Sequence, residues 1–503
     1  MRKFILMLAA SFAAMTLSVS GSAEVTEEQL RAHIAILASD DFEGREPGTP
    51  GEKKTIEYIA GEWKKSHLIP AAKDGSWFEP VALVERSIGS AETSFYNKGR
   101  KLRFADSEIL LTGTEADYQN GSLPVFFAGY GVNAKGNPVG DVAGKLVLMF
   151  AGGADYLPVD KRSPRARREI LVKAGAQAVV LIADSAAAGS WPALRRQMGS
   201  SGLALQAREI RAPLQGAASA EFAVGLATAA AQDWDKISMA AATEDFAGID
   251  FGITADVKVT TNVRRFNSYN VIGKIPGKKK NLGAVLYMGH WDHLGLCRPE
   301  GDADRICNGA VDNASGIAVL AEVARALGRK RHDRDIYFIA TTAEESGLLG
   351  AYSFADNPVI PLGDIVAALN IDTIAIAPRR SKVAIIGRGT TKLDGIIETV
   401  ARGLKREIEP SNDANAFIRR QDGWALAEKG VPALMVGGSF ADMKKLQVFL
   451  SGDYHGPGDE LTGNTELGGA AEDTDLHIAL GKYFASGRKY SREKTEQGEK
   501  AGD

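Results

Sequence analysis

The chain has 503 residues, and a prior of roughly 150 residues per domain predicts about three domains. Its apolar fraction of 45% and charged fraction of 24% are ordinary for a globular protein. A net charge of −3 gives no basic patch, so nucleic acid and anionic membranes are poor candidates as partners.

The first residues have the pattern of a secretory signal peptide. Arg2 and Lys3 precede an apolar run from Phe4 to Leu17, and small residues follow up to Ala23. The run is short for a membrane span, although an N-terminal membrane anchor is the alternative. We therefore expect a signal peptide over residues 1–23 and an exported protein, periplasmic or secreted, with no membrane anchor after cleavage.

The next region predicts two helices and then short strands. Apolar residues recur at helical spacing from Glu27 to Ala38 and again from Glu52 to Lys65, with a turn rich in glycine and proline between them. Residues from Trp77 to Leu111 are expected to form short strands and turns.

Residues 116–255 are interpreted as an inserted domain. This segment is rich in alanine and lacks clusters of metal-binding residues. Strands are expected at Pro124 to Tyr130, Leu146 to Phe150 and Ala178 to Ala183, with a helix at Arg165 to Ala174. An integral lobe of the main domain is the alternative interpretation.

The main domain is assigned to residues 24–115 and 256–488. Expected strands are Ala284 to Met288, Asp335 to Ala340, Ile365 to Asn370, Lys382 to Ile386 and Ala433 to Val436. Expected helices are Ala314 to Leu327, Gly347 to Asp356, Lys392 to Lys405 and Gly423 to Lys429. This alternation predicts an α/β fold with a mixed, largely parallel central sheet flanked by helices. The polar residues 489–503 are expected to form a disordered tail.

Potential metal ligands follow the predicted strands of this domain. In open α/β sheets, ligands bind at the carboxyl ends of the strands. Histidine and carboxylate side chains are ligands for Zn²⁺, and more carboxylates than one ion needs indicate two ions. His455, in a polar loop, supplies a nitrogen for the second ion, whereas His33, His67, His332 and His477 are given structural roles. The ligand-type residues at strand ends are His290, Asp292, Asp312, Glu344, Glu345 and Asp372.

The chain has two cysteines, Cys297 and Cys307, in a polar loop between His290 and Asp312. Because export places them in an oxidising compartment, we expect a disulfide, with two free thiols as the alternative. Their spacing matches no common zinc motif. In either state the loop is expected to lie at the rim of the site.

These motifs together resemble the M28 family of zinc peptidases, in the subgroup with an inserted protease-associated domain. The resemblance covers most of the chain after residue 23 and is weakest in the inserted segment. The motifs are GHWDHLG at Gly289 to Gly295, NGAVDNASG at Asn308 to Gly316, AEESGLLG at Ala343 to Gly350, NID at Asn370 to Asp372, DYH at Asp453 to His455, DDFEGR at Asp40 to Arg45, GTPG at Gly48 to Gly51 and NVIGKIPG at Asn270 to Gly277.

The resemblance implies a zinc-exopeptidase-like fold with a mostly-β protease-associated insertion, and a role for each ligand-type residue. His290 and Asp372 would bind one zinc ion, Glu345 and His455 the other, and Asp312 would bridge the two. Glu344 would be the general base, and Asp292 would orient His290 through the second ring nitrogen. Tyr454 is a candidate for stabilising the oxyanion.

The implied reaction is removal of N-terminal residues from peptides with a free α-amine. Carboxypeptidases and glutaminyl cyclases of the same fold remain alternatives, as does a catalytically silent metal-binding module. No cluster of arginines near the motifs suggests a pocket for a terminal carboxylate. Residue preference, natural substrate and oligomeric state are left open.

Overall fold

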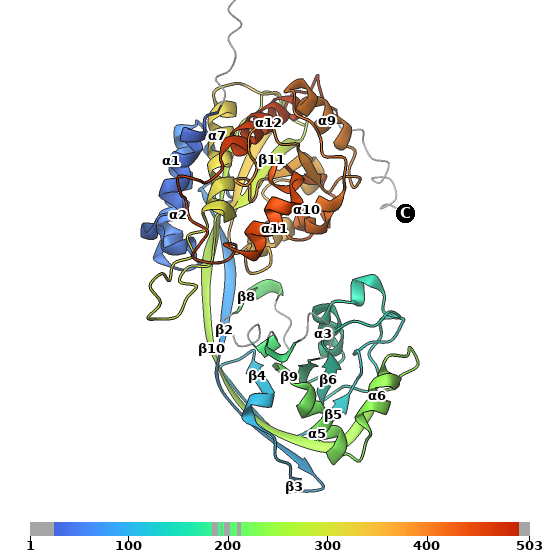
Figure 1. Ribbon diagram of the computed structural model, residues 1–503. Helices are drawn as coiled ribbons and strands as arrows, with labels where there is room; N and C mark the ends of the chain where they lie inside the picture. The colour runs from blue at the N-terminus through green and yellow to red at the C-terminus, as the bar shows by residue number, and fades with distance from the viewer. Residues whose placement is uncertain (1–24, 184–189, 193, 196–201, 209–212, 492–503) are drawn as a thin grey trace, which may run out of the picture.

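The computed structural model describes residues 25–183, 190–192, 194–195, 202–208 and 213–491. The signal peptide expected at residues 1–23 lies outside these residues, as do residues 492–503. The described chain forms two lobes, a larger and a smaller one, connected by the long strands β2 (Phe78–Asn97) and β10 (Ile249–Ile275) (Figure 1). Among the described residues, no helix combines the length and apolarity that crossing a bilayer requires.

The larger lobe is built on a mixed sheet with the strand order β14-β15-β13-β11-β12-β10. The pairs β11–β12, β11–β13 and β13–β15 are parallel, whereas β10 and β14 pair antiparallel at the two ends of this series. All residues of β11 and β13 are buried, as expected for strands covered by helices on both faces. The predicted fold class is therefore confirmed. The strands are β1 (Ile69–Pro70), β11 (Ala284–His290), β12 (Asp335–Thr341), β13 (Ile365–Asn370), β14 (Ala384–Ile386) and β15 (Ala433–Gly437).

Helices cover this sheet and form most of the core with it. On one face α7 packs against α1, α2 and α12 (Figure 1). Trp63 of α2 is buried, and its ring lies 5.9 Å from that of Phe338 in β12. The helices are α1 (Glu27–Leu37), α2 (Pro50–Lys65), α7 (Ser315–Gly328), α8 (Leu349–Asp356), α9 (Asp394–Gly403), α10 (Gly423–Ala427), α11 (Met443–Ser451) and α12 (Gly468–Phe484).

The smaller lobe contains a second stretch of sheet with its own core. Its strand order is β5-β6-β7-β9-β4, and β5 pairs with β10. Its helices also contribute to this core, and the mostly-β type expected for the insertion stays a prediction. The elements are β3 (Arg100–Lys101), β4 (Ile109–Gly113), β5 (Asp117–Phe127), β6 (Leu146–Phe150), α3 (Pro164–Lys173), β7 (Ala178–Ile182), β9 (Leu214–Ala218), α5 (Ala220–Ala229) and α6 (Trp234–Ala241). The short strand β8 (Gly202–Leu205) pairs with β2, and its Leu205 packs against Leu349 of the larger lobe.

Two expectations differ from the structure. The segment from Trp77 to Leu111 contains the 20-residue strand β2 in place of a series of short strands. Within the expected tail, Tyr490 packs against the core, with its ring 5.1 Å from that of Phe484. The expected boundary at residues 255/256 falls inside β10, and the division into two domains stays a prediction, as does the protease-associated type of the insertion.

Candidate metal centre

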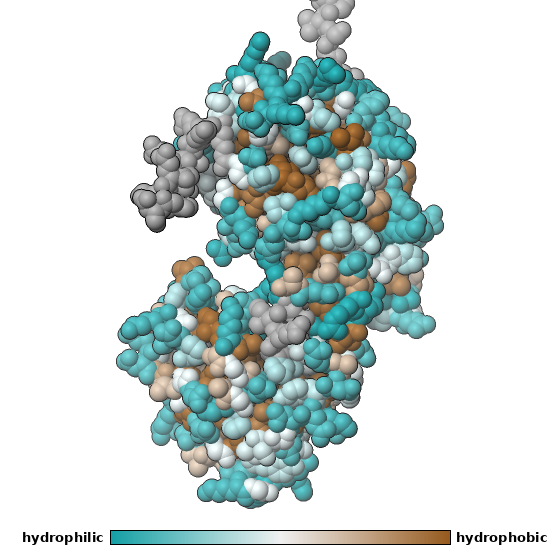
Figure 2. Space-filling view, turned by 180° about the vertical axis from the view of Figure 1, so that it is seen from behind, coloured by the Kyte–Doolittle hydropathy of each residue, from teal (hydrophilic) through white to brown (hydrophobic). Residues whose placement is uncertain are grey.

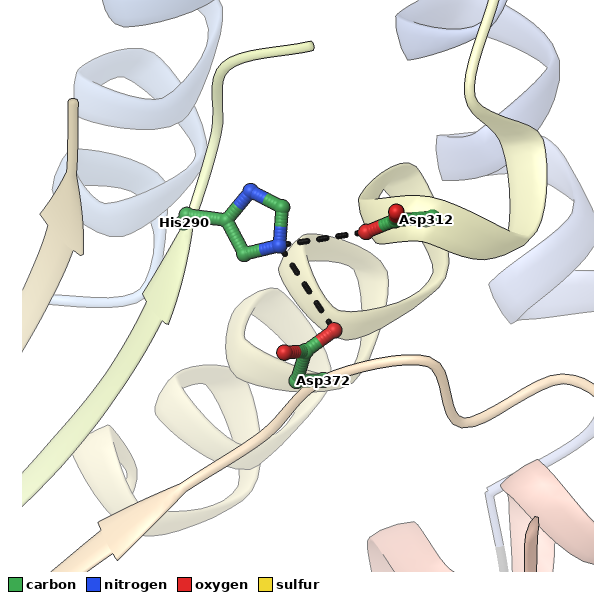
Figure 3. Close-up of side chains that lie close together, drawn as sticks. All are labelled: His290, Asp312 and Asp372. Carbon is green, nitrogen blue, oxygen red and sulfur yellow. Dashed lines mark ion pairs between the residues drawn. The ribbon is translucent and has the colours of Figure 1, made fainter. Parts of the chain in front are cut away.

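Three buried side chains converge where strands of the larger lobe end. His290 is the last residue of β11, Asp312 lies in a short π-helical segment (Ala310–Ala314) before α7, and Asp372 follows β13 by two residues. Figure 3 shows the three side chains pointing toward one another. Because β11 and β13 are parallel neighbours, their carboxyl ends lie at the same edge of the sheet.

The spacing of these donor atoms suits a metal ion. Nε2 of His290 lies 3.2 Å from Oδ1 of Asp312 and 3.5 Å from Oδ1 of Asp372 (Figure 3). Two donors that share a tetrahedral zinc ion, each at about 2.1 Å from it, are roughly 3.4 Å apart. The nitrogen and oxygen donors of this group therefore fit Zn²⁺ without rearrangement of the chain.

A second group shares Asp312 with the first. Nε2 of His455 lies 2.8 Å from Oε2 of Glu345 and 3.4 Å from Oδ2 of Asp312. The two oxygens of Asp312 thus face different histidines, which is the arrangement that a bridging carboxylate needs. The side chain of His455 is 36% exposed, against 2% for His290, so one half of the cluster is more open than the other.

Glycines and buried polar groups explain why the loops approach so closely. A Cβ on Gly289 would lie 2.5 Å from the carbonyl oxygen of Ile371, so only glycine permits the contact. The side-chain amide of Asn313 donates to the carbonyl oxygens of His290 and Ile371, each at 3.2 Å. These contacts fix the loop before α7 to the ends of β11 and β13.

Two buried charged side chains also form hydrogen bonds with the backbone of the loop that carries Asp312. The carboxylate of Asp459 accepts the backbone N–H groups of Val311 at 2.8 Å and Asp312 at 3.0 Å. The buried guanidinium of Arg45 donates to the carbonyl oxygens of Asn308 and Gly309 at 2.6 and 2.9 Å. Arg45 belongs to the N-terminal DDFEGR motif, so its contacts give that motif a structural purpose at the site.

The cluster is electrostatically organised for positive charge. Burial alone would lower the pKa of His290, but Glu344, Asp312 and Asp372 raise it well above its usual value. Burial would raise the pKa of Asp312, yet its hydrogen bonds with His290 and His455 hold it well below the usual range. Asp312 and Glu345 raise the pKa of His455 to about 9, against the effect of burial. The carboxylates thus stabilise any cation placed among them.

Glu344 and Glu345 are adjacent but have different surroundings. The side chain of Glu345 contacts His455 and His293, whereas no hydrogen bond or ion pair engages the side chain of Glu344 within the described chain. Burial and then the charges of Glu345 and Asp422 raise the pKa of Glu344 well above normal, although His290 opposes them. These surroundings favour the protonated form of Glu344, whereas the pKa of Glu345 is lowered.

Asp292 lies beside the second ring nitrogen of His290, and its main chain makes the closer contact. Nδ1 of His290 lies 3.1 Å from the main-chain oxygen of Asp292, whereas the carboxylate is 3.8 Å away. The carboxylate instead accepts the backbone N–H groups of Glu344 at 3.0 Å and Glu345 at 3.4 Å. Asp292 thus orients His290 through its carbonyl group and fixes both glutamates through its side chain.

His293 is a site residue that the sequence reasoning missed. Its Nδ1 lies 2.6 Å from Oε1 of Glu345, and it belongs with Asp312 and Glu345 to a second group able to hold a metal ion. The imidazole is fully buried and positions the oxygen of Glu345 that does not face His455. Its place in the HWDH motif, three residues after His290, was the available signal.

A cavity of about 280 Å³ opens onto the cluster; we call it the first cavity. Its wall combines the metal-binding carboxylates with an apolar surface made by Phe417, Met435, Phe440, Leu446 and Leu450. Tyr454 lies in the wall with its ring stacked 3.7 Å from that of His455.

Arg419 and Arg420 also line the first cavity, which corrects the expectation that no arginine pair lies near the motifs. They lie in the segment between a short helix (Asp413–Phe417) and α10. The chain brings them to the cavity from well outside the metal-binding motifs, so motif spacing did not reveal them.

The two cysteines are bonded in the structure, with a sulfur–sulfur distance of 1.96 Å. The base of their loop is fixed to the DDFEGR segment, because the N–H of Gly295 donates to the carbonyl of Gly44 at 3.0 Å. The disulfide therefore constrains the chain between His290 and Asp312.

The fold and the cluster can be compared with known proteins. Residues 270–476 match the profile described as Peptidase family M28, and this range contains every proposed metal ligand. This part of the chain is therefore similar to peptidases of that family.

Individual curated proteins are also similar to parts of this chain. The probable leucine aminopeptidase 2 of Aspergillus fumigatus is 26% identical over 234 residues, which cover 42% of this chain and 43% of that protein. Aminopeptidase YwaD of Bacillus subtilis is 34% identical over 109 residues, covering 21% of this chain and 22% of that protein. The chain spans less than half the length of these curated relatives.

A solved structure extends the similarity of fold to both lobes. The aminopeptidase from Aneurinibacillus sp. strain AM-1 superimposes with a TM-score of 0.55 at 18% identity, covering 92% of this chain and 94% of that one. At this identity the comparison establishes the shared fold alone.

Proposed function

We propose that the protein is an exported di-zinc aminopeptidase that removes N-terminal residues from peptides. The observation that carries the proposal is the pair of donor groups around Asp312, each with a histidine nitrogen and a further carboxylate. The relatives with aminopeptidase activity in their names support the same reaction.

The roles of the side chains follow from their positions. His290, Asp372 and one oxygen of Asp312 would hold one zinc ion, and Glu345, His455 and the other oxygen of Asp312 would hold the second. Two zinc ions bound there supply Lewis acidity, which lowers the pKa of a water molecule and polarises the scissile carbonyl.

Glu344 is the general base of the proposed reaction. It removes a proton from the attacking water and delivers it to the leaving amine. Its carboxylate is available for this task because its neighbour Glu345 makes the metal-side contacts. Tyr454, whose ring stacks on that of His455, would donate a hydrogen bond to the oxyanion.

The wall of the first cavity supports a preference for apolar N-terminal residues. Apolar side chains line the cavity together with the carboxylates, and a leucine or phenylalanine side chain would bury its surface against them. The carboxylates of the same cavity attract the positively charged α-amine of the substrate.

A carboxypeptidase is the second candidate, and one observation favours it. Arg419 and Arg420 line the same cavity as the metal ligands, and paired guanidinium groups are suited to a terminal carboxylate. The two candidates differ in the end of the peptide that must be free.

The decisive experiment compares leucyl-p-nitroanilide with its N-acetylated form, before and after chelation and return of zinc. Zinc-restored cleavage of the free-amine substrate alone is the expected result. Equal rates on the acetylated form would reject the aminopeptidase. Release of the C-terminal residue from an N-acetylated peptide would establish the carboxypeptidase instead.

A further inference from the structure

A second cavity of about 290 Å³ adjoins the first one. Gly347, in the loop that follows Glu344 and Glu345, lines both cavities. The second cavity lies where β2 and α3 come near the larger lobe, and a deep indentation separates the lobes on one side of the molecule (Figure 2). A ligand that extends beyond the metal cluster along this loop therefore enters the second cavity.

The described lining of the second cavity is strongly basic. It includes four arginines, and no aspartate or glutamate is among the lining residues that the structure describes. They come from β2, α3 and the short helix Gln206–Arg208: Arg86, Arg165, Arg168 and Arg208.

The four arginines differ in how far neighbouring groups neutralise them. Arg208 is paired with Asp356 at 2.6 Å, and Arg165 lies 3.5 Å from Glu169. Arg168 is half-buried and makes no ion pair with any described residue. Burial and then the charge of Arg165 lower its pKa, and the charge of Glu169 opposes them only in part, so an anion bound in the cavity would stabilise this cation.

We propose that the second cavity is an anion subsite of the peptide-binding cleft, in which Arg168, flanked by Arg86 and Arg165, binds a carboxylate of the substrate. This inference rests on the proposed aminopeptidase function. In such an enzyme nothing precedes the N-terminal residue, so the carboxylate belongs to the part of the peptide beyond the scissile bond. It comes from the C-terminus of a short peptide or from an acidic side chain.

Two substrate pairs distinguish these sources. Leu-Gly-Gly is compared with its C-terminal amide, and Leu-Gly-Glu-amide is compared with Leu-Gly-Gln-amide. The wild-type enzyme is expected to prefer the carboxylate member of at least one pair by about tenfold in kcat/KM, through a lower KM, as one charge-assisted contact provides.

The variant Arg168→Gln is expected to lose this preference, and Arg168→Lys to retain part of it. Leucyl-p-nitroanilide has no carboxylate, so its turnover by Arg168→Gln should match that of the wild type and also reports correct folding. As a matched control, Arg331→Gln changes an exposed arginine just before β12, at the opposite edge of the sheet, and should keep the full preference.

Equal wild-type rates within both pairs would overturn the inference, as would a preference that survives Arg168→Gln. Either result leaves the aminopeptidase itself intact if leucyl-p-nitroanilide is cleaved. Failure of the zinc-loaded wild type to cleave any of these substrates would instead overturn the proposed function and this inference with it.

Discussion

The two adjoining cavities share Gly347 but carry opposite charge. Four carboxylates line the first cavity and outnumber its two arginines, whereas four arginines and no described carboxylate line the second. Like charges held together are unfavourable unless a counter-charge binds between them, so the sign of each cavity indicates its ligand. The first is built for cations and the second for an anion, and the peptide proposed to bind here offers a positive amine and a negative carboxylate.

The largest expected effect is the loss of turnover when one carboxylate of the first cavity is replaced by an amide of the same shape. Glu344→Gln should lower kcat by about three orders of magnitude, because the proposed general base is lost while the proposed metal ligands remain. Zinc content, measured by mass spectrometry of the metal, should stay near that of the wild type. The exposed Glu300→Gln serves as a matched control, and unchanged turnover in Glu344→Gln would remove Glu344 as the base.

Replacing either histidine of the metal cluster tests whether each one binds a separate zinc ion. Either His290→Ala or His455→Ala should reduce bound zinc by about one ion per chain and activity by about a hundredfold or more. His290 is buried among carboxylates, so its loss should also cost about 3 kcal/mol in the free energy of unfolding, whereas the exposed His455 should cost little. Equal losses of stability in urea denaturation would contradict the difference in burial.

The pH dependence of the free energy of unfolding tests a buried histidine that does not line the first cavity. His477 of α12 is fully buried, its Nε2 lies 2.9 Å from the carbonyl of Val436 in β15, and burial lowers its pKa to about 4. In the unfolded chain the imidazole of His477 binds a proton near pH 6.5, whereas in the folded protein it stays neutral down to about pH 4. The stability of the folded state is therefore unaffected by this group above pH 6.5 and falls as the pH decreases from 6.5 toward 4.

The loss attributable to His477 amounts to about 3 kcal/mol, from a pKa change from 6.5 to about 4. His477→Gln should therefore flatten the fall in stability between pH 7 and pH 4 in denaturant titrations. The exposed His67→Gln is the matched control and should retain the wild-type slope. An unchanged slope in His477→Gln would show that other groups cause the acid sensitivity.

The smallest expected effect is a difference between two substrates in how KM depends on ionic strength. Raising salt from 0.05 to 0.5 M shortens the screening length, so KM for Leu-Gly-Glu-amide should rise severalfold as attraction to the second cavity weakens. KM for leucyl-p-nitroanilide, which does not reach that cavity, should change little. Parallel changes for both substrates in steady-state kinetics would indicate a general salt effect.

The sequence predicted most of the metal-binding residues of the first cavity but none of the arginines of the second. His290 ends a buried parallel strand, and Glu344 and Asp372 each follow another one closely, so the rule for strand ends predicted that they converge. His293 was adjacent to this pattern but received no role, because hydrogen bonding to Glu345 depends on the path of the loop.

The second cavity had no such signal. Arg86, Arg168 and Arg208 lie on a strand, a helix and a short helical turn that share no sheet edge. The exposed residues in the middle of β2 have no apolar alternation, so its length and its pairing with β10 could not be derived either. Both features depend on contacts between segments that are far apart in the chain.

The paired strands β2 and β10 form one continuous connection between the lobes. Their ladder joins Phe78 with Val271 in the larger lobe and Asn97 with Ile253 in the smaller one, with a single irregularity between Thr260 and Thr261. Along these two strands the connection is therefore a hydrogen-bonded ribbon and not a loop. The second cavity is lined both from α3 and from the loop of Gly347, so the twist of this ribbon determines how its two walls face each other.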